Sequence, residues 1–372
     1  MIPQLDLRRQ HERLRDELLA ATARVLAGSR FILGPEVRAL EEELAACGGA
    51  RHGIGVNSGT DALLLALRAV GVGPGDEVIT SPFSFVASAT TIVLAGATPI
   101  YADIDPETLN LDPDRLAAVI TARTRAIVPV HLYGHPAPMD RIEAIARAHG
   151  VAVVADAAQA VGARYDGKGV AAWGDASCLS FYPTKNLGAC GDGGMVLTPR
   201  DDVAERVRLL RDHGSARRYV HVELGFSSRL DELQAALLRV KLKRLDEWSE
   251  ARRRLALRYA ALFEGLPLLL PAERPPAWHV YHQYTVRHPR RDALAQALAE
   301  LGVGTTVHYP RILPAQPLFA REPAPTEAAA NAFPHAARAA ADVLSLPCFP
   351  ELTDAEIEGV GAAMRQALAR LG

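Results

Sequence analysis

The chain has 372 residues, of which 49% are hydrophobic, enough for a large domain with a smaller one attached. Its 41 basic and 43 acidic residues leave a net charge of −2, which argues against nucleic acid or an anionic membrane as partner. No apolar run approaches the roughly 20 residues that span a bilayer, and the four cysteines lack the CxxC spacing of a metal site. We therefore expect a cytoplasmic protein with a small-molecule partner.

In chain order, Gln10–Leu26 carries leucines at helical spacing and is expected to lie against the body of the protein or a partner subunit. From about Gly53 to Leu210, short apolar runs alternate with helical patterns such as Asp61–Ala69 and Arg141–Ala148. This alternation predicts an α/β fold with a mostly parallel central sheet. The expected strands are Ile54–Val56, Glu77–Thr80, Thr98–Tyr101, Ala126–Val130, Val151–Ala155, Ser177–Phe181 and Gly194–Leu197.

The last third of the chain has a different pattern. A linking helix is predicted from a serine cap at Ser227–Ser228 to about Tyr259. The later expected elements are a strand at Tyr281–Val286, helices at Arg291–Leu301 and Asp354–Leu371, and a loop at Pro314–Ala329. We divide the chain into an N-terminal arm and large α/β domain, residues 1–245, and a small C-terminal α+β domain, residues 246–372.

Small polar residues lie between a predicted strand and a predicted helix at Asn57-Ser58-Gly59-Thr60-Asp61. Free backbone N–H groups and the helix dipole make such a junction a site for phosphate, and Gly59 and Thr60 are the candidates. An ordinary helix cap is the alternative for this segment.

Asp156 ends an apolar strand at the carboxyl edge, where parallel sheets bind ligands. A carboxylate at this edge could keep a pyridinium nitrogen protonated, so that the ring accepts electrons from a substrate carbanion. Gln159 could then hydrogen-bond the ring's phenolic oxygen. Taken alone, an Asp at a strand end is as typical of a cap or a metal ligand.

Lys185 follows Pro183 and precedes the glycine-rich turn Gly188–Gly194, which permits close approach of the backbone to a ligand. A lysine that forms an imine must lose its proton near neutral pH, which burial and nearby positive charge favour. Most lysines are surface residues, but the neighbours of Lys185 are apolar or small. The pattern is compatible with a covalent cofactor lysine.

Four segments stand in order along the chain: Asn57–Ala62, Asp156–Ala160, Ser180–Asn186 and Gly191–Gly194. Together they resemble the DegT/DnrJ/EryC1/StrS family of sugar aminotransferases. The resemblance extends over nearly the whole chain, including Pro82–Ala87, Tyr101–Asp105 and Pro129–Gly134. It implies the aspartate-aminotransferase-like fold, called fold type I, and pyridoxal 5'-phosphate as cofactor.

The resemblance also implies roles for individual residues. Lys185 is the Schiff-base lysine, Asp156 pairs with the pyridine nitrogen, and Gln159 lies beside the phenolic oxygen. The residues expected to hold the phosphate or to stack on the ring are Gly59, Thr60, Ser180 and Phe85, the last of which would otherwise be a core residue.

Similar enzymes build each active site from two subunits, so the resemblance implies a homodimer. Ser227 stands where family members usually carry an Asn that reaches the phosphate of the neighbouring subunit, and serine is shorter. Tyr219 is a second candidate for a contribution across the interface.

The implied reaction is a two-half transamination between an amino acid and a nucleotide-linked keto sugar, of the kind used in making cell-surface polysaccharides. Glutamate is the expected donor, with glutamine open. Ser228–Leu242 and Gly304–Pro310 look more like the branch acting on dTDP-linked 3-keto-6-deoxy sugars, with 4-keto sugars as the alternative. Within the second segment, His308 and Tyr309 are candidates for sugar or phosphate contacts, or for a structural role.

Two other readings compete. Related dehydrating enzymes carry a histidine in place of the lysine, which Lys185 argues against. A non-catalytic regulator could keep the same fold, because fold alone does not fix function. A nicotinamide enzyme is disfavoured, since no GxGxxG follows an early strand.

Overall fold

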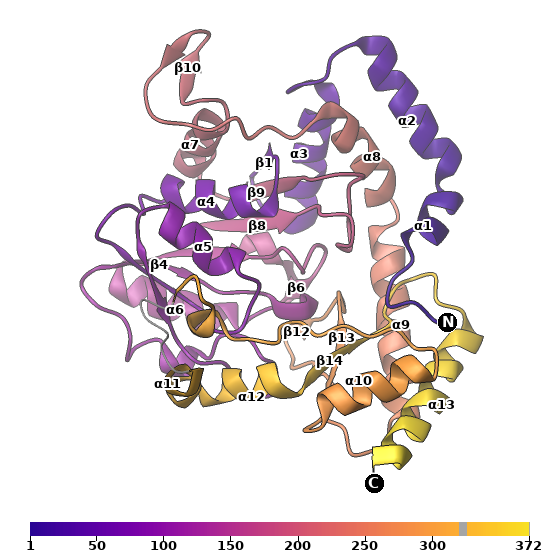
Figure 1. The fold of residues 1–372 in the computed structure, drawn as a ribbon. Helices are drawn as coiled ribbons and strands as arrows, with labels where there is room; N and C mark the ends of the chain where they lie inside the picture. Colours follow the sequence, from indigo (N-terminus) through magenta and orange to yellow (C-terminus); the bar gives the residue numbers. More distant parts are fainter. Residues whose placement is uncertain (320–325, 372) are drawn as a thin grey trace.

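A computed structural model describes residues 1–319 and 326–371 (Figure 1). Its centre is a seven-stranded sheet in the order β1-β9-β8-β5-β4-β2-β3. The strands are β1 (His52–Val56), β2 (Glu77–Thr80), β3 (Thr98–Tyr101), β4 (Thr124–Val128), β5 (Ala152–Asp156), β8 (Ala176–Ser180) and β9 (Gly194–Thr198). β9 runs antiparallel to both neighbours, and the other pairs are parallel. The predicted α/β fold is confirmed, and all seven predicted strands lie within two residues of these bounds.

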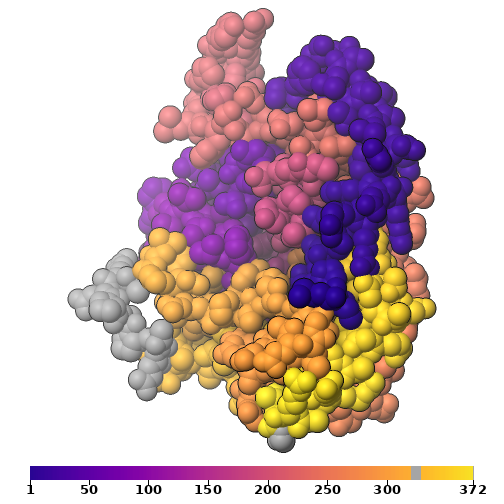
Figure 2. All heavy atoms as spheres, turned by 45° about the vertical axis from the view of Figure 1, so that its right-hand side comes forward, coloured from indigo at the N-terminus to yellow at the C-terminus, as the bar shows by residue number. Residues whose placement is uncertain are grey.

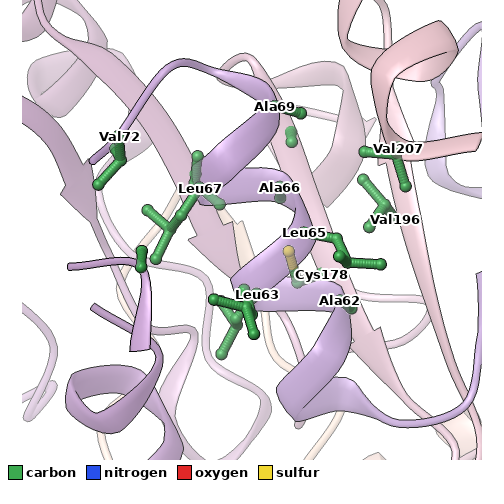
Figure 3. Packing of buried hydrophobic residues seen from close by; sticks show 14 of the residues in the cluster. Ala62, Leu63, Leu65, Ala66, Leu67, Ala69, Val72, Cys178, Val196 and Val207 are labelled. Carbon is green, nitrogen blue, oxygen red and sulfur yellow. The ribbon is translucent and has the colours of Figure 1, made fainter. Parts of the chain in front are cut away.

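Helices cover both faces of this sheet. One face packs against α4 (Gly59–Ala69), α5 (Ala87–Leu94) and α7 (Asp201–Arg211), where Leu63, Leu65, Cys178, Val196 and Val207 meet in one apolar cluster (Figure 3). The opposite face packs against α3 (Pro35–Gly48) and α6 (Met139–His149). Successive strand residues serve opposite faces, as Val153 and Val154 do, because strand side chains alternate. Burial on both faces accounts for the continuous apolar runs in the sequence.

The N-terminal helical segment lies against the body of the protein, which was one of the two expectations for it, whereas the linking helix differs from its prediction. The first consists of α1 (Leu7–Arg13) and α2 (Arg15–Gly28), and α2 packs on α8 (Glu232–Leu242). The predicted linking helix is divided into α8 and α9 (Leu245–Leu262), and its cap is Asp231 rather than a serine. The hydroxyl of Ser228, which was expected to cap the helix, instead donates a hydrogen bond to Asn57 Oδ1 at 3.1 Å in a tertiary contact.

The C-terminal part packs around a separate apolar cluster. Its elements are β13 (Tyr284–Arg287), α10 (Arg291–Glu300), α11 (Thr326–Ala332), α12 (Pro334–Asp342), β14 (Val343–Leu346) and α13 (Asp354–Leu371). Of these, α11 and α12 pack instead in a cluster with Phe83 and Val130 of the large α/β part. The predicted strand at Tyr281–Val286 begins too early, because Tyr281 has a φ of 44°, which a strand does not accommodate. The predicted loop at Pro314–Ala329 is wrong at its end, where α11 begins, and residues 320–325 lie outside the described ones.

Short strands complete the fold. β6 (Arg164–Tyr165), β7 (Lys168–Gly169) and β12 (Ala277–Trp278) form one small sheet. β10 (Ser215–Arg217) and β11 (Val220–His221) form a hairpin that projects beyond α7 (Figure 1). Among the described residues, no helix combines the length and apolar character that crossing a membrane requires.

The first residues of the chain lie on the C-terminal part. Ile2 bridges Val303, and Arg9 forms an ion pair with Glu356 on α13 at 2.6 Å. In Figure 2 the indigo N-terminal residues accordingly lie against the yellow end of the chain. The division of the chain at residue 245 stays a prediction.

Candidate active site

The carboxyl ends of β5 and β8 meet the N-terminus of α4 at a cavity of about 510 Å³. This is the edge where open α/β sheets place ligands. Nine of the residues singled out in the sequence line this cavity: Gly59, Thr60, Phe85, Asp156, Gln159, Ser180, Lys185, His308 and Tyr309. The fold therefore brings together segments that are more than 200 residues apart in the chain.

Lys185 and Asp156 are the principal ionisable groups of the cavity. Burial lowers the pKa of Lys185 to about 8, although the nearby Asp156 carboxylate acts in the opposite direction. Burial raises the pKa of Asp156, whose oxygens accept hydrogen bonds from Ser88 Oγ at 2.8 Å and Ala158 N at 3.2 Å. A buried carboxylate held in this way is completed by a cation, and a protonated pyridine nitrogen has the required charge.

The N-terminus of α4 provides an anion site. Ser58 caps the helix by accepting a hydrogen bond from Asp61 N at 3.0 Å, so the cap and the predicted phosphate site coexist. The backbone N–H groups of Gly59 and Thr60, in the first turn, have no partner within the helix. A Cβ on Gly59 would lie 2.6 Å from the Cβ of Ser180, so only glycine allows the helix to approach β8 this closely. A phosphate fits this junction.

Gln159 is fixed by two hydrogen bonds. Its Oε1 accepts from Tyr133 N at 2.6 Å, and its Nε2 donates to Tyr309 Oη at 3.0 Å. With its oxygen occupied, Gln159 has an amide donor left for an oxygen in the cavity. The ring of Phe85 is 51% exposed and lies 6.0 Å from that of Tyr309, so Phe85 is an accessible aromatic surface and not a core residue.

Two histidines line the cavity in their uncharged form. His308 Nδ1 lies 2.9 Å from Ser345 Oγ, and burial together with the charge of Lys185 lowers the pKa of His308 to about 4. His282 Nδ1 lies 3.0 Å from Asn186 Oδ1, and burial again lowers its pKa well below the usual range. Neither ring therefore adds a positive charge at neutral pH.

Two predicted residues are not in this cavity. Ser227 lines a neighbouring hollow of about 590 Å³ and accepts a hydrogen bond from Arg229 Nη2 at 2.9 Å. Tyr219 is 80% exposed on the β10–β11 hairpin, which projects from the body (Figure 1). Within one chain, neither side chain belongs to the cavity that holds Lys185.

Sequence reasoning missed several residues that shape the site. Ser88 orients Asp156, Tyr133 orients Gln159 through its backbone, and Asn186 contacts His282. Asn186, next to Lys185, and Tyr133, within Pro129–Gly134, lay inside segments that carried the family resemblance, but neither was singled out. Ser88 and Asp156 are 68 residues apart, and no local pattern links them.

Residues 12–365 match the sequence model of the DegT/DnrJ/EryC1/StrS aminotransferase family. This chain belongs to that family. Members of the family depend on pyridoxal phosphate, and several relatives of this chain are named as sugar-nucleotide aminotransferases. The buried carboxylate, the open helix N-terminus and the lysine of lowered pKa fit that cofactor in this member.

Sequence similarity to individual relatives extends over almost the whole chain. It is 50% identical to a "Pleiotropic regulatory protein" of Geobacillus stearothermophilus, over 95% of each chain. It is 46% identical to the dTDP-3-amino-3,4,6-trideoxy-alpha-D-glucose transaminase of Streptomyces venezuelae, over 98% of this chain and 96% of that one. It is 45% identical to the UDP-N-acetyl-3-dehydro-alpha-D-glucosamine 3-aminotransferase of Acidithiobacillus ferrooxidans, over 99% and 98%.

A solved structure agrees with the fold throughout. DesV of S. venezuelae, determined in complex with a ketimine intermediate, superposes with a TM-score of 0.96 and 45% identity, over 100% of this chain and 99% of that one. The predicted fold type and family are thus confirmed.

Proposed function

We propose that this protein transfers an amino group from glutamate to a nucleotide-linked 3-keto sugar, such as a dTDP-3-keto-6-deoxyhexose, with pyridoxal 5'-phosphate as cofactor. The observation that carries the proposal is the placing of Lys185, with its lowered pKa, in one cavity with Asp156 and the N-terminus of α4. Names of relatives support the substrate class.

Besides Lys185 and Gln159, five residues would hold the cofactor. Gly59, Thr60 and Ser180 would hold its phosphate and Asp156 would keep the ring nitrogen protonated, and all four line the cavity. Phe85 offers an apolar face for the ring. When bound, pyridoxal phosphate supplies a conjugated ring that stabilises negative charge on the substrate carbon.

Lys185 would have two tasks, covalent attachment of the cofactor and proton transfer. A pKa of about 8 means that its Nζ is present both with and without a proton near neutral pH. A group with this property accepts a proton from one carbon and returns it to another, as general acid–base catalysis requires. The lowered pKa values of His282 and His308 make both rings weak bases. Lys185 is therefore the base of suitable strength in this part of the cavity.

The keto position is better supported than the nucleotide. Relatives named for UDP-linked substrates and relatives named for dTDP-linked substrates all specify position 3 in their names, as a 3-amino, 3-oxo or 3-dehydro group. We therefore favour a 3-keto sugar over the 4-keto alternative. The regulatory and sensory names of two relatives keep a non-catalytic role as the second candidate.

The protein would act in the cytoplasm as a homodimer. Ser227 and Tyr219, expected to serve a shared site, lie outside the cavity of their own chain. The hairpin region also exposes Val222 and Leu224, which is unusual for a surface without a partner. A second copy of the chain would cover this apolar surface.

The test uses purified protein loaded with pyridoxal phosphate. Visible absorbance of the lysine-bound cofactor is expected to disappear with glutamate and to return when a 3-keto sugar nucleotide is added. A panel of dTDP- and UDP-linked sugars, each in 3-keto and 4-keto form, assigns position and nucleotide. A protein that never takes up the cofactor would favour the regulatory role. Turnover of 4-keto sugars alone would show that the amino group is added at position 4 and not at position 3.

A further inference from the structure

A second, smaller cavity of about 110 Å³ adjoins the first. The two share four lining residues, Thr184, His282, Gln283 and His308. The other residues that line the smaller cavity are Gln4, Leu5, Arg252 and Cys348. It is therefore a recess beside the main cavity, and the segment just before Lys185 forms part of their common wall.

Arg252 on α9 is a buried cation, only 5% exposed. Its Nη1 donates to Tyr281 O at 3.2 Å, to His282 O at 3.3 Å and to Cys348 O. These acceptors are neutral carbonyls, and the Nε of Arg252 is buried without a hydrogen-bond partner among the described residues. A buried guanidinium with an unused donor is costly, and a carboxylate is the ligand whose charge and geometry match it.

The main cavity lacks such a group. Among the described residues that line it, the charged ones are Lys185, Asp156 and Asp192, and none is an arginine. Because the two histidines are uncharged, Arg252 is the permanent cation that lines either cavity within residues 1–319 and 326–371. An amino-acid donor with two carboxylates needs positive charge that the main cavity does not provide.

A short chain of contacts links Arg252 to the reacting end. His282 accepts a hydrogen bond from Arg252 through its backbone oxygen, and its ring contacts Asn186, the residue after Lys185. The carbon that loses its proton must lie near Lys185, and the α-carboxylate is bonded directly to that carbon. The side-chain carboxylate lies at the other end of the donor, away from that carbon. It can therefore enter a recess that adjoins the main cavity.

We propose that this recess binds the side-chain carboxylate of the amino donor, and that Arg252 selects glutamate over glutamine. The inference rests on the proposed aminotransferase function. An amide in place of the carboxylate loses a charge-assisted bidentate contact, so glutamate is expected to be preferred by on the order of 10- to 100-fold.

A structural role for Arg252 is the alternative. Glu351 is also buried, its Oε1 has no partner among the described residues, and the charge of Arg252 opposes the rise that burial causes in its pKa. Arg252 would then serve to balance Glu351. In that case replacing both residues by glutamine would restore what the single replacement loses.

The experiment separates the two half-reactions of the holoenzyme by stopped-flow absorbance. Arg252→Gln is expected to raise the glutamate concentration for half-maximal rate on the order of 10- to 100-fold. The glutamine value and the half-reaction with the keto sugar should change little. Arg253→Gln is the matched control, since Arg253 is on the same helix, pairs with Glu273 at 2.6 Å and lines neither cavity.

Three results would overturn the assignment. The first is an unchanged dependence of the rate on glutamate concentration in Arg252→Gln. The second is an equal loss of apparent affinity for glutamate and for glutamine, which would mean that Arg252 acts on the α-carboxylate. The third is recovery of the affinity for glutamate in Arg252→Gln/Glu351→Gln. If Arg252→Gln does not fold, calorimetry on wild-type protein replaces it. Glutarate should then bind and compete with glutamate, and 4-carbamoylbutanoate should not; equal binding rejects the inference. Wild-type protein that reacts with no amino acid would instead reject the proposed function.

Discussion

The resemblance to the family implied site roles for two groups of residues, the inner wall of the main cavity (Asp156, Ser180 and Lys185) and an outer rim (Ser227 and Tyr219), and the fold places the two groups differently. Asp156 and Ser180 end neighbouring strands of one buried sheet, and a single chain brings them together with Lys185. Ser227 and Tyr219 lie on segments outside that cavity. The comparison teaches that one chain is enough to bring Asp156, Ser180 and Lys185 together, whereas it leaves Ser227 and Tyr219 outside their cavity.

The inner wall is defined by burial. Hydrogen bonds from Ser88 and Ala158 fix Asp156, and the contact of Gly59 with Ser180 leaves no room for a Cβ. The rim has few such constraints, because Tyr219 and Leu224 are largely exposed on and beside a two-stranded hairpin. A two-stranded hairpin without packing on a third element is only marginally stable by itself.

The largest effect is expected at the inner wall from Lys185→Ala. Losing the covalent anchor and the acid–base group should lower the transamination rate on the order of 10³-fold or more. Steady-state turnover and visible absorbance measure it. Lys243→Ala, an exposed lysine on the same chain, should leave both unchanged. Substantial turnover by Lys185→Ala would contradict the assignment.

The second largest effect is expected from Asp156→Asn. The neutral amide keeps the size of the side chain but no longer favours a protonated ring nitrogen, so the rate should fall on the order of 10²-fold. Half-reaction rates with glutamate measure the loss, and the melting temperature checks that the fold persists. A rate within a factor of about 2 of wild type would remove Asp156 from the mechanism.

The pH dependence should show the lowered pKa of Lys185. The amine attacks the cofactor only without its proton, and this fraction rises with pH and levels off above about 8. Uptake of pyridoxal phosphate by cofactor-free protein should therefore quicken on the order of tenfold from pH 7 to the plateau. Absorbance stopped-flow measures the profile. A plateau reached only near the ordinary lysine pKa of 10.5 would show that the amine is not desolvated.

The smallest effect is expected at the rim. Tyr219→Ala removes an exposed side chain outside the cavity, so cofactor uptake should change by no more than about twofold. Fluorescence titration with pyridoxal phosphate measures the affinity. A large loss would break the distinction between wall and rim and would show that the hairpin of a second copy completes the cofactor site.

Much of the site could be predicted because its residues lie in local patterns. A strand followed by small polar residues and a helix identified Gly59 and Thr60, and an apolar strand ending in a carboxylate identified Asp156. Errors arose where tertiary contacts compete with local propensity. Ser228 was expected to cap a helix, but its hydroxyl bonds to Asn57, which is 171 residues away.

By itself the sequence determined the alternation of strands and helices, the family, and the choice of Lys185, Asp156 and Gly59 as candidate site residues. Each of these inferences depends on a pattern among residues that are close together in the chain. Only the tertiary structure decided that Ser88 orients Asp156, that Arg252 lines a recess beside Lys185, and that Tyr219 lies away from the cavity. These depend on packing between segments far apart in the chain, where burial and unmet hydrogen bonds have no local signature.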